Sequence, residues 1–368
     1  MKRRRVHLIA AARPNFMKVA PLHRALAREA WCSPCIVHTG QHYDANMSDA
    51  FFRDLDLPEP GHHLEVGGGS HAEQVGRTMM AYERVCLEDR PDAIVVVGDV
   101  NATAACALVG TKLWIPVVHL EAGLRSGDRR MPEEINRRVT DSISDLLWTP
   151  SSDADSNLRN EGVPATRIDR VGNIMIDSFE MLRERIEEAD VAGRMKLVSP
   201  YAVVTLHRPS NVDDAATLES LVSILERLAA RLEIVFAVHP RTRKRLAEFG
   251  LERRVFENPH IRASEPLGYI EFMSLVRGCA IAVTDSGGVQ EETTYLGIPC
   301  ATVRENTERP VTVSEGTNRL ARPTELPELI EQALAGQWPR GHRPENWDGR
   351  TAERACASLE RFLRNSTA

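Results

Sequence analysis

The sequence predicts an α/β protein with two parallel β-sheets, and three of its features lead to this fold class. Short apolar runs alternate with helical patterns from one end of the chain to the other. The runs are continuous, as in the Ala-Ile-Val-Val-Val of residues 93–97, which is typical of strands covered on both faces. The pattern starts again near residue 201, so we expect two domains in the 368 residues.

The first half of the chain supplies four strands and four helices. We identify the strands by their unbroken apolar runs and the helices by the periodicity between them. The expected strands cover residues 6–11, 35–39, 93–97 and 117–120. The expected helices cover residues 21–30, 74–88, 104–113 and 133–146.

The second half repeats this order after a domain boundary. The expected strands cover residues 201–206, 234–238 and 280–284, and the expected helices cover residues 216–231, 271–277, 289–296 and 352–365. A charged helical stretch at 181–190 precedes the first of these strands, which puts the boundary within residues 172–200. We set the first domain at residues 1–175 and the second at residues 176–351.

The charge balance and composition exclude several classes of function. The 46 Lys and Arg residues are outnumbered by 52 Asp and Glu residues, and the net charge of -6 argues against nucleic-acid binding through bulk charge. Aromatic residues make up 5% of the chain, too few for a platform that stacks single strands. No apolar run approaches the roughly 18 residues of a membrane span. We therefore expect neither a nucleic-acid nor a membrane partner.

The cysteines and the N-terminus favour a cytoplasmic location. Seven scattered cysteines are typical of reduced, intracellular usage. Cys32 and Cys35 form a lone Cys-x-x-Cys, which we interpret as two incidental thiols because no second pair or His-rich tract accompanies them. The apolar stretch at 6–12 is too short and too polar for the core of a signal peptide.

Small, charged or His-containing segments follow each predicted strand at once. In open parallel sheets, ligands bind at the carboxyl ends of strands, and two such sheets facing each other would line one cleft. The alternative is that these segments are ordinary loops that bind no ligand. That alternative accounts for one such segment more easily than for seven at equivalent positions. The seven are ARPN at 12–15, GQH at 40–42, GDVN at 98–101, EAGLR at 121–125, HRPSN at 207–211, HPR at 239–241 and DSGG at 285–288.

Ser286, Gly287 and Gly288 lie between a predicted strand and a predicted helix and form a candidate diphosphate site. Glycine lets the backbone approach a ligand closely, and a helix N-terminus offers free N–H groups. The alternative is an ordinary tight turn with a Ser cap. Glu292 lies one turn into the helix, where a carboxylate can accept hydrogen bonds from a ribose diol. No Gly-x-Gly-x-x-Gly follows the first strand and no Walker A motif occurs, so nicotinamide and P-loop chemistry lose support.

Cations and carboxylates complete the candidate site. Arg13, Lys18 and Arg309 are candidates for neutralising a diphosphate, against the alternative that each is a solvated surface charge. Asp99 and Glu121 end neighbouring predicted strands, which suits an acid–base pair.

Glu133 opens a helix, where its alternative role is to stabilise the helix N-terminus. Arg137 lies four residues later and could pair with Glu133. We interpret His207 and His239 as hydrogen-bonding or acid–base groups, because they lack the close spacing of metal ligands, and His119 as a structural strand residue. We therefore expect no metal site.

These motifs together resemble those of the non-hydrolysing UDP-N-acetylglucosamine 2-epimerases. The resemblance runs in the same order from the first strand to about Arg319, nearly the whole chain. The matching segments are Arg13-Pro14 with Lys18, Gly98-Asp99, HLEAGLRSGD at 119–128, MPEEINR at 131–137, LHRPSN at 206–211, VHPR at 238–241, TDSGGVQEE at 284–292 and ENTERPVTVSEGTNR at 305–319.

This resemblance implies a fold like that of the GT-B glycosyltransferases, with two Rossmann-like domains whose parallel sheets face a central cleft. The C-terminal helix, residues 352–366, would return to the first domain. The family uses neither a metal nor a nicotinamide cofactor, and its members are commonly homodimers. The resemblance implies catalytic positions at Asp99, Glu121, Glu133 and His207. It implies substrate-binding positions at Arg13, Lys18, Arg137, His239, Ser286, Gly287, Gly288, Glu292 and Arg309.

The implied activity is the reversible C2 epimerisation of UDP-N-acetylglucosamine to UDP-N-acetylmannosamine. Alternatives are a hydrolysing 2-epimerase or an epimerase of a related UDP-diacetamido sugar, then a GT-B glycosyltransferase, then a UDP-sugar sensor without catalysis. Two departures from the family bear on this choice. Asn15 replaces a common Glu, and Gln41-His42 is spaced differently from the Q-H-x-x-M motif linked to allosteric activation. A stretch similar to TGQHYDANM at 39–47 occurs in relatives that act on diacetamido-uronic sugars, which leaves the sugar open.

Overall fold

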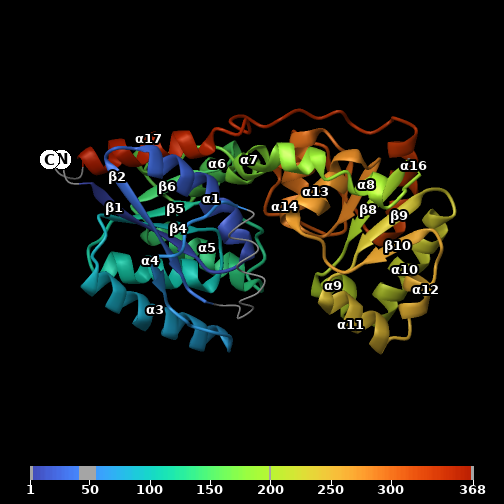
Figure 1. Cartoon of the computed structure of the whole chain (residues 1–368), viewed down its shortest axis with the longest axis horizontal. Helices are drawn as coiled ribbons and strands as arrows, with labels where there is room; N and C mark the ends of the chain where they lie inside the picture. The colour runs from blue at the N-terminus through green and yellow to red at the C-terminus, as the bar shows by residue number, and fades with distance from the viewer. Residues whose placement is uncertain (1–2, 41–54, 199, 366–368) are drawn as a thin grey trace. The chain divides into compact units, whose positions relative to one another are not determined.

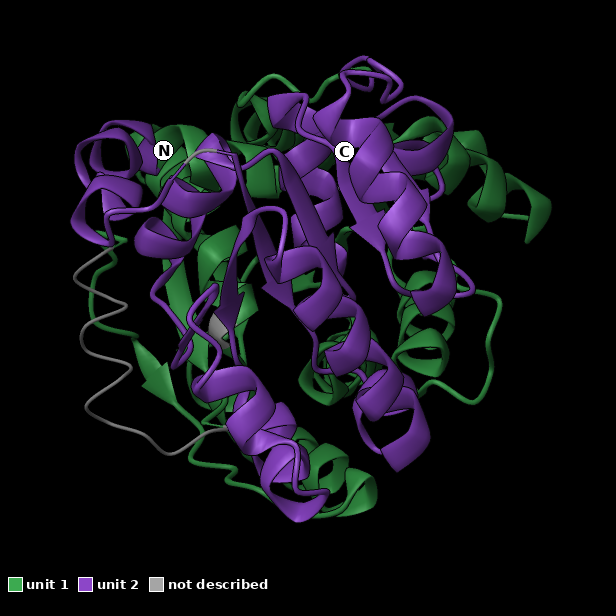
Figure 2. Cartoon of the chain, turned by 90° about the vertical axis from the view of Figure 1, so that its right-hand side faces the viewer, with its two compact units in different colours: residues 1–181, 345–368 green, residues 182–344 purple. Residues whose placement is uncertain are grey.

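The computed structural model describes residues 3–40, 55–198 and 200–365 (Figure 1). The chain divides into two compact units, unit 1 (Met1–Met181 with Glu345–Ala368) and unit 2 (Leu182–Pro344) (Figure 2). Each unit is built on one parallel sheet with helices around it, so the predicted fold class is confirmed. Residues 176–181 and 345–351 lie in unit 1, outside the limits that we set for the first domain. None of the described helices is both long and apolar enough to cross a membrane.

Unit 1 contains a seven-stranded sheet in the order β3-β2-β1-β4-β5-β6-β7. Its strands are β1 (Arg4–Ala10), β2 (Cys32–His38), β3 (His62–His63), β4 (Ala93–Val97), β5 (Val117–Leu120), β6 (Leu146–Thr149) and β7 (Ile168–Arg170). Its helices are α1 (Arg13–Arg28), α3 (His71–Glu88), α4 (Asn101–Lys112), α5 (Pro132–Ile143), α6 (Ser152–Asn160), α17 (Thr351–Asn365) and the start of α7 (Ile174–Glu188).

Strand β6 corrects the predicted helix at 133–146, which was too long. Helix α5 ends at Ile143, and Ser144 takes an extended backbone while its hydroxyl donates to the Thr140 carbonyl at 2.8 Å. The next apolar residues, Leu146–Thr149, are fully buried as a strand. A short apolar run after a helix fits either structure by periodicity, so the pattern alone could not separate them.

Helix α1 begins eight residues before the predicted start at Pro21, because Arg13 and Pro14 already occupy its first turn. Pro21 therefore lies inside the helix, where it cannot donate a hydrogen bond to the Met17 carbonyl. The Ser178 hydroxyl on α7 donates to that carbonyl instead, at 2.5 Å. A tertiary hydrogen bond thus replaces the missing helical one.

The C-terminal helix α17 packs against α1 in unit 1. The Asp177 carboxylate accepts from the backbone N–H groups of Thr351 and Ala352, at 3.1 and 2.8 Å, where α17 begins. The Trp148 indole on β6 donates to the Ser358 hydroxyl at 2.8 Å. Buried hydrogen bonds therefore fix both the start and the middle of this helix.

Unit 2 contains a six-stranded sheet in the order β10-β9-β8-β11-β12-β13. Its strands are β8 (Tyr201–Thr205), β9 (Glu233–Ala237), β10 (Ile261–Ser264), β11 (Ile281–Thr284), β12 (Cys300–Thr302) and β13 (Asn318–Leu320). Its helices are α8 (Val191–Arg194), α9 (Pro209–Val212), α10 (Ala215–Ala229), α11 (Pro240–Glu248), α12 (Glu252–Phe256), α13 (Tyr269–Gly278), α14 (Gly287–Leu296), α15 (Val311–Ser314) and α16 (Leu326–Leu334).

The two sheets share the strand order of the doubly wound dinucleotide-binding fold. In each unit the chain winds outward from the first strand on one side and then outward on the other side. The order reverses between β1 and β4 in unit 1 and between β8 and β11 in unit 2. Loops diverge at such a point and leave room for a ligand at the carboxyl ends of the strands. The segments after these strands are therefore the place to look for a site.

Candidate active site

Glu121 follows β5 in unit 1 and has the most unusual environment of the predicted site residues. Its backbone φ is +72°, in the left-handed region that non-glycine residues rarely adopt. Its side chain is 5% exposed and forms an ion pair with the Lys18 ammonium of α1 through Oε2. Its other oxygen, Oε1, is buried and has no hydrogen-bond partner among the described residues. A buried carboxylate oxygen without a partner is costly, and such an atom is available to a ligand.

Asp99 follows β4, the strand next to β5, and its carboxylate is held by Arg137. The Arg137 Nε and Nη2 atoms donate to Asp99 Oδ2 at 3.0 and 2.6 Å. The Asp99 side chain is 31% exposed, whereas the Arg137 side chain is 3% exposed. Arg137 therefore orients a carboxylate that stays accessible from solvent.

The predicted pairing of Arg137 with Glu133 is wrong. Arg137 Nη1 donates to Glu134 Oε2 at 3.1 Å instead, because Glu134 points into the protein while Glu133 is only partly buried. Burial alone would raise the pKa of Glu134, but hydrogen bonds from Ser126 and the nearby Arg137 lower it below its ordinary value. Among the described residues, Glu133 makes no hydrogen bond or ion pair. It lies in the first turn of α5, so it also suits the helix dipole.

A buried hydrogen-bonded group holds the loops that carry Asp99 and Glu121. His119 on β5 contacts the Asp141 carboxylate through Nδ1 at 2.6 Å and the Gly98 carbonyl through Nε2 at 2.8 Å. Asp141 Oδ2 also accepts from the Gly123 amide at 3.1 Å and pairs with Arg125 at 2.7 Å. His119 is thus a structural strand residue, as predicted, and it joins the ends of β4 and β5.

Two predicted segments of unit 1 are incompletely described. The side chain of Arg13 and residues 41–42 of the GQH segment lie outside the described part of the structure. Asn15, which replaces a common Glu of the family, is buried, and its amide joins the Ala12 N–H to the Val97 carbonyl. This residue therefore ties the first turn of α1 to the end of β4.

In unit 2, Asp285 organises the segments that follow β8 and β11. Its carboxylate is fully buried and accepts from the backbone N–H groups of His207 and Arg208, both at 2.9 Å, and from the Asn211 amide at 2.9 Å. His207 Nδ1 lies 2.8 Å from Asp285 Oδ1. Burial alone would raise the pKa of Asp285, but the contacts with His207 and Asn211 lower it. Asp285 thereby orients the His207 ring, which is one-third exposed.

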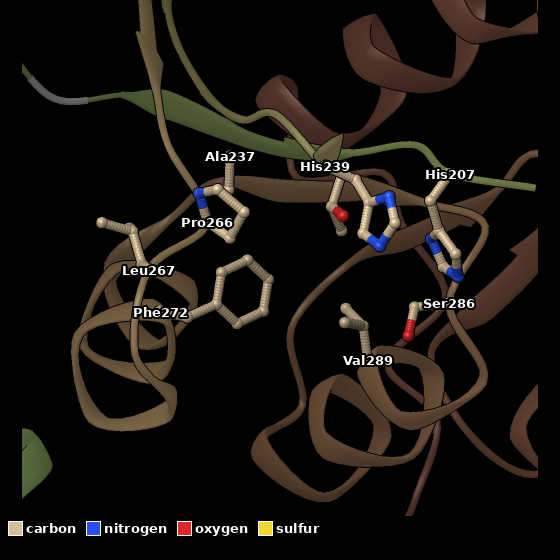
Figure 3. A pocket seen from close by; sticks show the side chains of 9 residues that line it. His207, Ala237, His239, Pro266, Leu267, Phe272, Ser286 and Val289 are labelled. Carbon is tan, nitrogen blue, oxygen red and sulfur yellow. The ribbon is translucent and has the colours of Figure 1, made fainter. Parts of the chain in front are cut away.

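His207 and His239 line a cavity of about 260 Å³ in unit 2 (Figure 3). Their ring centroids lie 5.3 Å apart. Burial, with a smaller effect from His207, lowers the pKa of His239, so this ring is neutral near pH 7. The opposite wall is apolar, and Figure 3 shows Pro266, Leu267 and Phe272 there with Ser286 at the histidine side. Such a cavity offers a flat apolar wall at one end and polar groups at the other.

Ser286 precedes the first residue of α14, as predicted, with Gly287 and Gly288 in its first turn. A Cβ atom on Gly287 would lie 2.5 Å from the Arg309 guanidinium, so a larger residue here would push Arg309 away from the helix N-terminus. Arg309 also forms an ion pair with Glu291 at 2.7 Å. The structure therefore brings a cation and a helix N-terminus together.

Glu292 lies one turn further into α14, where it is 4% exposed. Burial is the main cause that raises the pKa of Glu292 to about 8, and the Glu291 carboxylate adds to it, whereas Tyr269 opposes it. Glu292 Oε1 and Tyr269 Oη are both buried, and neither has a partner at ordinary hydrogen-bond distance within the described part of the chain, although Tyr269 lies near enough to lower the pKa of Glu292. These atoms are ready to bind polar groups of a ligand.

The predicted residues thus fall into two groups. The unit 1 group contains Arg13, whose side chain lies outside the described part of the structure, with Lys18, Asp99, Glu121, Glu133 and Arg137. The unit 2 group contains His207, His239, Ser286, Gly287, Gly288, Glu292 and Arg309. Sequence reasoning placed Asp285 in the DSGG segment at 285–288 but gave it no role, and it missed the wall of Pro266, Leu267 and Phe272. That wall follows β10, a short strand that we did not predict, so its place at a strand end went unnoticed.

A protein-family model described as UDP-N-acetylglucosamine 2-epimerase matches residues 24–360. The UDP-N-acetylglucosamine 2-epimerase of Methanocaldococcus jannaschii is 43% identical over 324 residues, which cover 86% of this chain and 88% of that protein. The UDP-2,3-diacetamido-2,3-dideoxy-D-glucuronate 2-epimerase of Pseudomonas aeruginosa is 40% identical over 317 residues, 85% of this chain and 86% of that protein.

Solved structures agree with these relationships. The crystal structure of the Methanocaldococcus jannaschii UDP-GlcNAc 2-epimerase in complex with UDP-GlcNAc and UDP has a TM-score of 0.88, with 40% identity over 97% of this chain and 99% of that chain. A glycosyltransferase of kitacinnamycin, at 12% identity and a TM-score of 0.57, covers 99% of this chain and 96% of its own and is similar in fold alone. The chain therefore belongs to the UDP-N-acetylglucosamine 2-epimerase family, whose members are isomerases.

Proposed function

We propose that this protein interconverts UDP-N-acetylglucosamine and UDP-N-acetylmannosamine by inverting C2 of the sugar. The observation that carries the proposal is the pair of carboxylates, Asp99 and Glu121, at the ends of adjacent strands β4 and β5. Each carboxylate contacts one cation, and Glu121 keeps a buried oxygen without a partner among the described residues. Inversion at a carbon requires an acid and a base on opposite faces, which two carboxylates from separate loops can supply.

The chemistry explains why the site must also bind UDP. The C2 hydrogen of an N-acetylhexosamine has no neighbouring ring carbonyl, so its direct removal as a proton is difficult. Departure of UDP from C1 creates a cation-like centre that makes this proton acidic. A carboxylate then removes the proton to give 2-acetamidoglucal, and UDP adds again at C1 while a proton arrives on the other face of C2.

The unit 2 group is our proposed site for UDP. The apolar wall with Phe272 suits a planar base, and the two unpartnered oxygens of Glu292 and Tyr269 suit a ribose diol. The N-terminus of α14 and Arg309 suit the diphosphate, whose negative charge grows as it leaves C1. His207, held by Asp285, is a hydrogen-bond donor for the same leaving group.

We further propose that the unit 1 group acts on the sugar of the substrate. Asp99, Glu121 and Glu133 are its acid–base residues, and Arg13, Lys18 and Arg137 are its cations. Exclusion of water during turnover would protect the cation-like centre from hydrolysis. Hydrolysis would need a bound water molecule at C1, and transfer of the sugar would need a binding position for an acceptor. Epimerisation needs neither.

The diacetamido-uronic sugar is the second candidate substrate, because the Pseudomonas aeruginosa relative that acts on it is 40% identical. Its sugar carries a carboxylate at C6, which calls for a cation. Lys18 and Arg137 already pair with Glu121 and Asp99, so a sugar carboxylate would compete with these protein carboxylates. This competition favours the neutral hydroxymethyl group of UDP-N-acetylglucosamine.

Proton NMR in D₂O tests the proposed function. Purified full-length protein is incubated with UDP-N-acetylglucosamine and separately with the diacetamido-uronic nucleotide sugar. The expected result is UDP-N-acetylmannosamine with deuterium at C2, formed from the first substrate. Free N-acetylmannosamine with UDP would mean hydrolysis, and reaction of the second substrate alone would overturn the proposed sugar. If the protein bound both nucleotide sugars and converted neither, it would be a UDP-sugar sensor, and the proposed enzyme activity would be overturned.

We also propose a homodimer and a cytoplasmic location. Met80 and Leu87 are seven residues apart on α3 and are 57% and 67% exposed, and Trp114 at the end of the adjacent α4 is 90% exposed. Such exposed apolar side chains favour a second copy as partner. All seven cysteines are free thiols, which suits a reducing compartment. Light scattering of the wild type and of Met80→Glu with Leu87→Glu tests the dimer, and a monomeric wild type would exclude it.

A further inference from the structure

A cluster of metal-ligand side chains lies in unit 1, away from the residues assigned to epimerisation. One ligand atom each from His7, Cys35 and His62 lies within 4.8 Å of the others. His7 on β1 and Cys35 on β2 are direct neighbours in the parallel register, and His62 begins β3 on the far side of β2. The sequence separates these residues widely, so no motif reveals the cluster, and only the strand order β3-β2-β1 brings them together.

Asp89 adds an oxygen to this cluster from the end of α3. Its Oδ2 atom lies 3.0 Å from His62 Nε2 and 3.9 Å from His7 Nε2. Its Oδ1 atom forms an ion pair with Arg5. The carboxylate is therefore fixed with one oxygen toward both histidines. In zinc sites, outer partners such as Arg5 orient the ligating groups.

His7 provides the independent sign of a ligand. Its ring is fully buried, and Nε2 has no hydrogen-bond partner in the described part of the chain. Its Nδ1 atom lies 3.1 Å from the Tyr82 hydroxyl. When Nδ1 carries the proton and donates it to Tyr82, Nε2 keeps a lone pair on the side of Asp89, whose Oδ2 lies 3.9 Å away. Burial is the main cause that lowers the pKa of His7 to about 4, so the ring is neutral near pH 7.

We propose that His7 Nε2, Cys35 Sγ, a ring nitrogen of His62 and Asp89 Oδ2 bind one divalent ion of the zinc class. Two imidazoles, a thiolate and a carboxylate are the donor types that zinc selects in tetrahedral sites. With bonds of about 2.0–2.3 Å, the ligand atoms of such an ion lie roughly 3.3–3.7 Å apart. The ligand atoms of His7, Cys35 and His62 lie within 4.8 Å of one another and need to move closer by about 1 Å, which side-chain rotation of the partly exposed Cys35 and His62 supplies. Asp89 Oδ2 already lies 3.0 Å from His62 Nε2 and 3.9 Å from His7 Nε2.

Two negative charges face the ion at this site. The Cys35 thiol loses its proton to solvent as the S–metal bond forms, so the thiolate and the Asp89 carboxylate together offset two of the three positive charges of the ion and Arg5. Burial raises the pKa of Cys35, which keeps the thiol protonated while no ion is bound. Arg5 stays paired with the outer oxygen of Asp89.

The position of the site assigns it a structural role. Asp89 follows the last residue of α3, whose end lies at the amino ends of the strands, whereas Glu121 and Asp99 follow the carboxyl ends. An ion there would tie β2, the edge strand β3 and the end of α3 to β1 (Figure 1). We therefore expect the ion to stabilise unit 1 without taking part in epimerisation.

Titration with Co²⁺ and Zn²⁺ tests the site. Full-length protein without a histidine tag is stripped with a chelator, kept reduced and titrated with Co²⁺, whose absorption reports thiolate bonding and tetrahedral geometry. We expect one ion per chain, a thiolate-to-cobalt band and displacement by Zn²⁺ with a rise in melting temperature. Cys35→Ser should abolish the band, and His62→Ala should weaken Zn²⁺ binding by about tenfold or more.

Two neighbours serve as matched controls. Cys32→Ser changes the other thiol of the Cys-x-x-Cys, and His63→Ala changes the adjacent histidine, which belongs to the same strand as His62. Both should bind Co²⁺ like the wild type. Circular dichroism of each metal-free variant checks folding, and X-ray absorption of the wild type with Zn²⁺ counts sulfur ligands without any substitution. Absence of saturable one-to-one binding, or a thiolate band that survives Cys35→Ser, would overturn the proposal.

Discussion

Replacement of Glu121 by Gln tests the assignment of the acid–base pair most directly. The amide keeps the shape of the side chain but can no longer accept a proton from C2 or return one. Loss of a general acid–base group costs about 10²–10⁴-fold in rate, which equals about 2.7–5.4 kcal/mol. We therefore expect kcat for C2 epimerisation to fall by that factor in Glu121→Gln.

The structure separates this effect from a loss of stability. Glu121 loses its charge toward Lys18, whose side chain is 11% exposed, but the amide oxygen still accepts a hydrogen bond. We expect the variant to be less stable by on the order of 1–3 kcal/mol, which leaves a folded protein. The unit 2 group, our proposed UDP site, is untouched, so the Kd for UDP should not change.

Asp155→Asn is the matched control for this experiment. Asp155 on α6 is buried in unit 1 and accepts from Arg170 at 2.9 and 2.6 Å, so it too is a carboxylate paired with a cation. The control should lose comparable stability in urea unfolding and keep the wild-type kcat. The assay is UDP-N-acetylmannosamine formation by NMR, with calorimetric UDP binding for each variant. A loss in Glu121→Gln smaller than about tenfold, or about 1.4 kcal/mol, would refute the assignment.

Three further predictions follow from the same contacts. Asp99→Asn should lower kcat by about 10²-fold or more with UDP affinity unchanged, and wild-type turnover would remove Asp99 from the acid–base pair. The pKa of Glu292 is raised from 4.5 to about 8 in the folded protein. Between these two pH values the Glu292 carboxyl is therefore protonated in the folded state and ionised in the unfolded state. Stability should therefore fall as pH rises through this window, and Glu292→Gln should flatten that dependence in thermal unfolding. Ser178→Ala leaves the Met17 carbonyl without a donor and should cost about 1–3 kcal/mol in urea unfolding. Adding Pro21→Ala restores the helical N–H and should recover most of this loss, and no recovery would contradict our account of α1.

The fold could be predicted from the sequence because parallel strands leave a clear signal. The runs at 93–97 and 117–120 are strands with these limits, since both are fully buried and each is followed by a polar segment. Strands β3, β7, β12 and β13 were missed because they are only two or three residues long. So short a run carries no periodicity, and neighbouring strands decide its conformation.

The side-chain pairings could not be predicted to the same extent. A spacing of four residues suggested that Arg137 pairs with Glu133, but three and four positions both bring helical side chains together. Burial decided between them, because Glu134 and Arg137 both face the interior. The metal-ligand cluster of His7, Cys35 and His62 shows the same limit more strongly, since its members meet only through strand order.

The departures from ordinary local structure coincide with the residues assigned to chemistry. Glu121 is the only fully buried non-glycine residue with a positive φ in the described part of the chain. Such a backbone costs about 1–3 kcal/mol, and the buried oxygen without a partner adds to it. The His119–Asp141 contacts and the Lys18 ion pair hold Glu121 in place against these costs. A structural glutamate would gain nothing from this arrangement, whereas a group that must face C2 of a sugar in one orientation would.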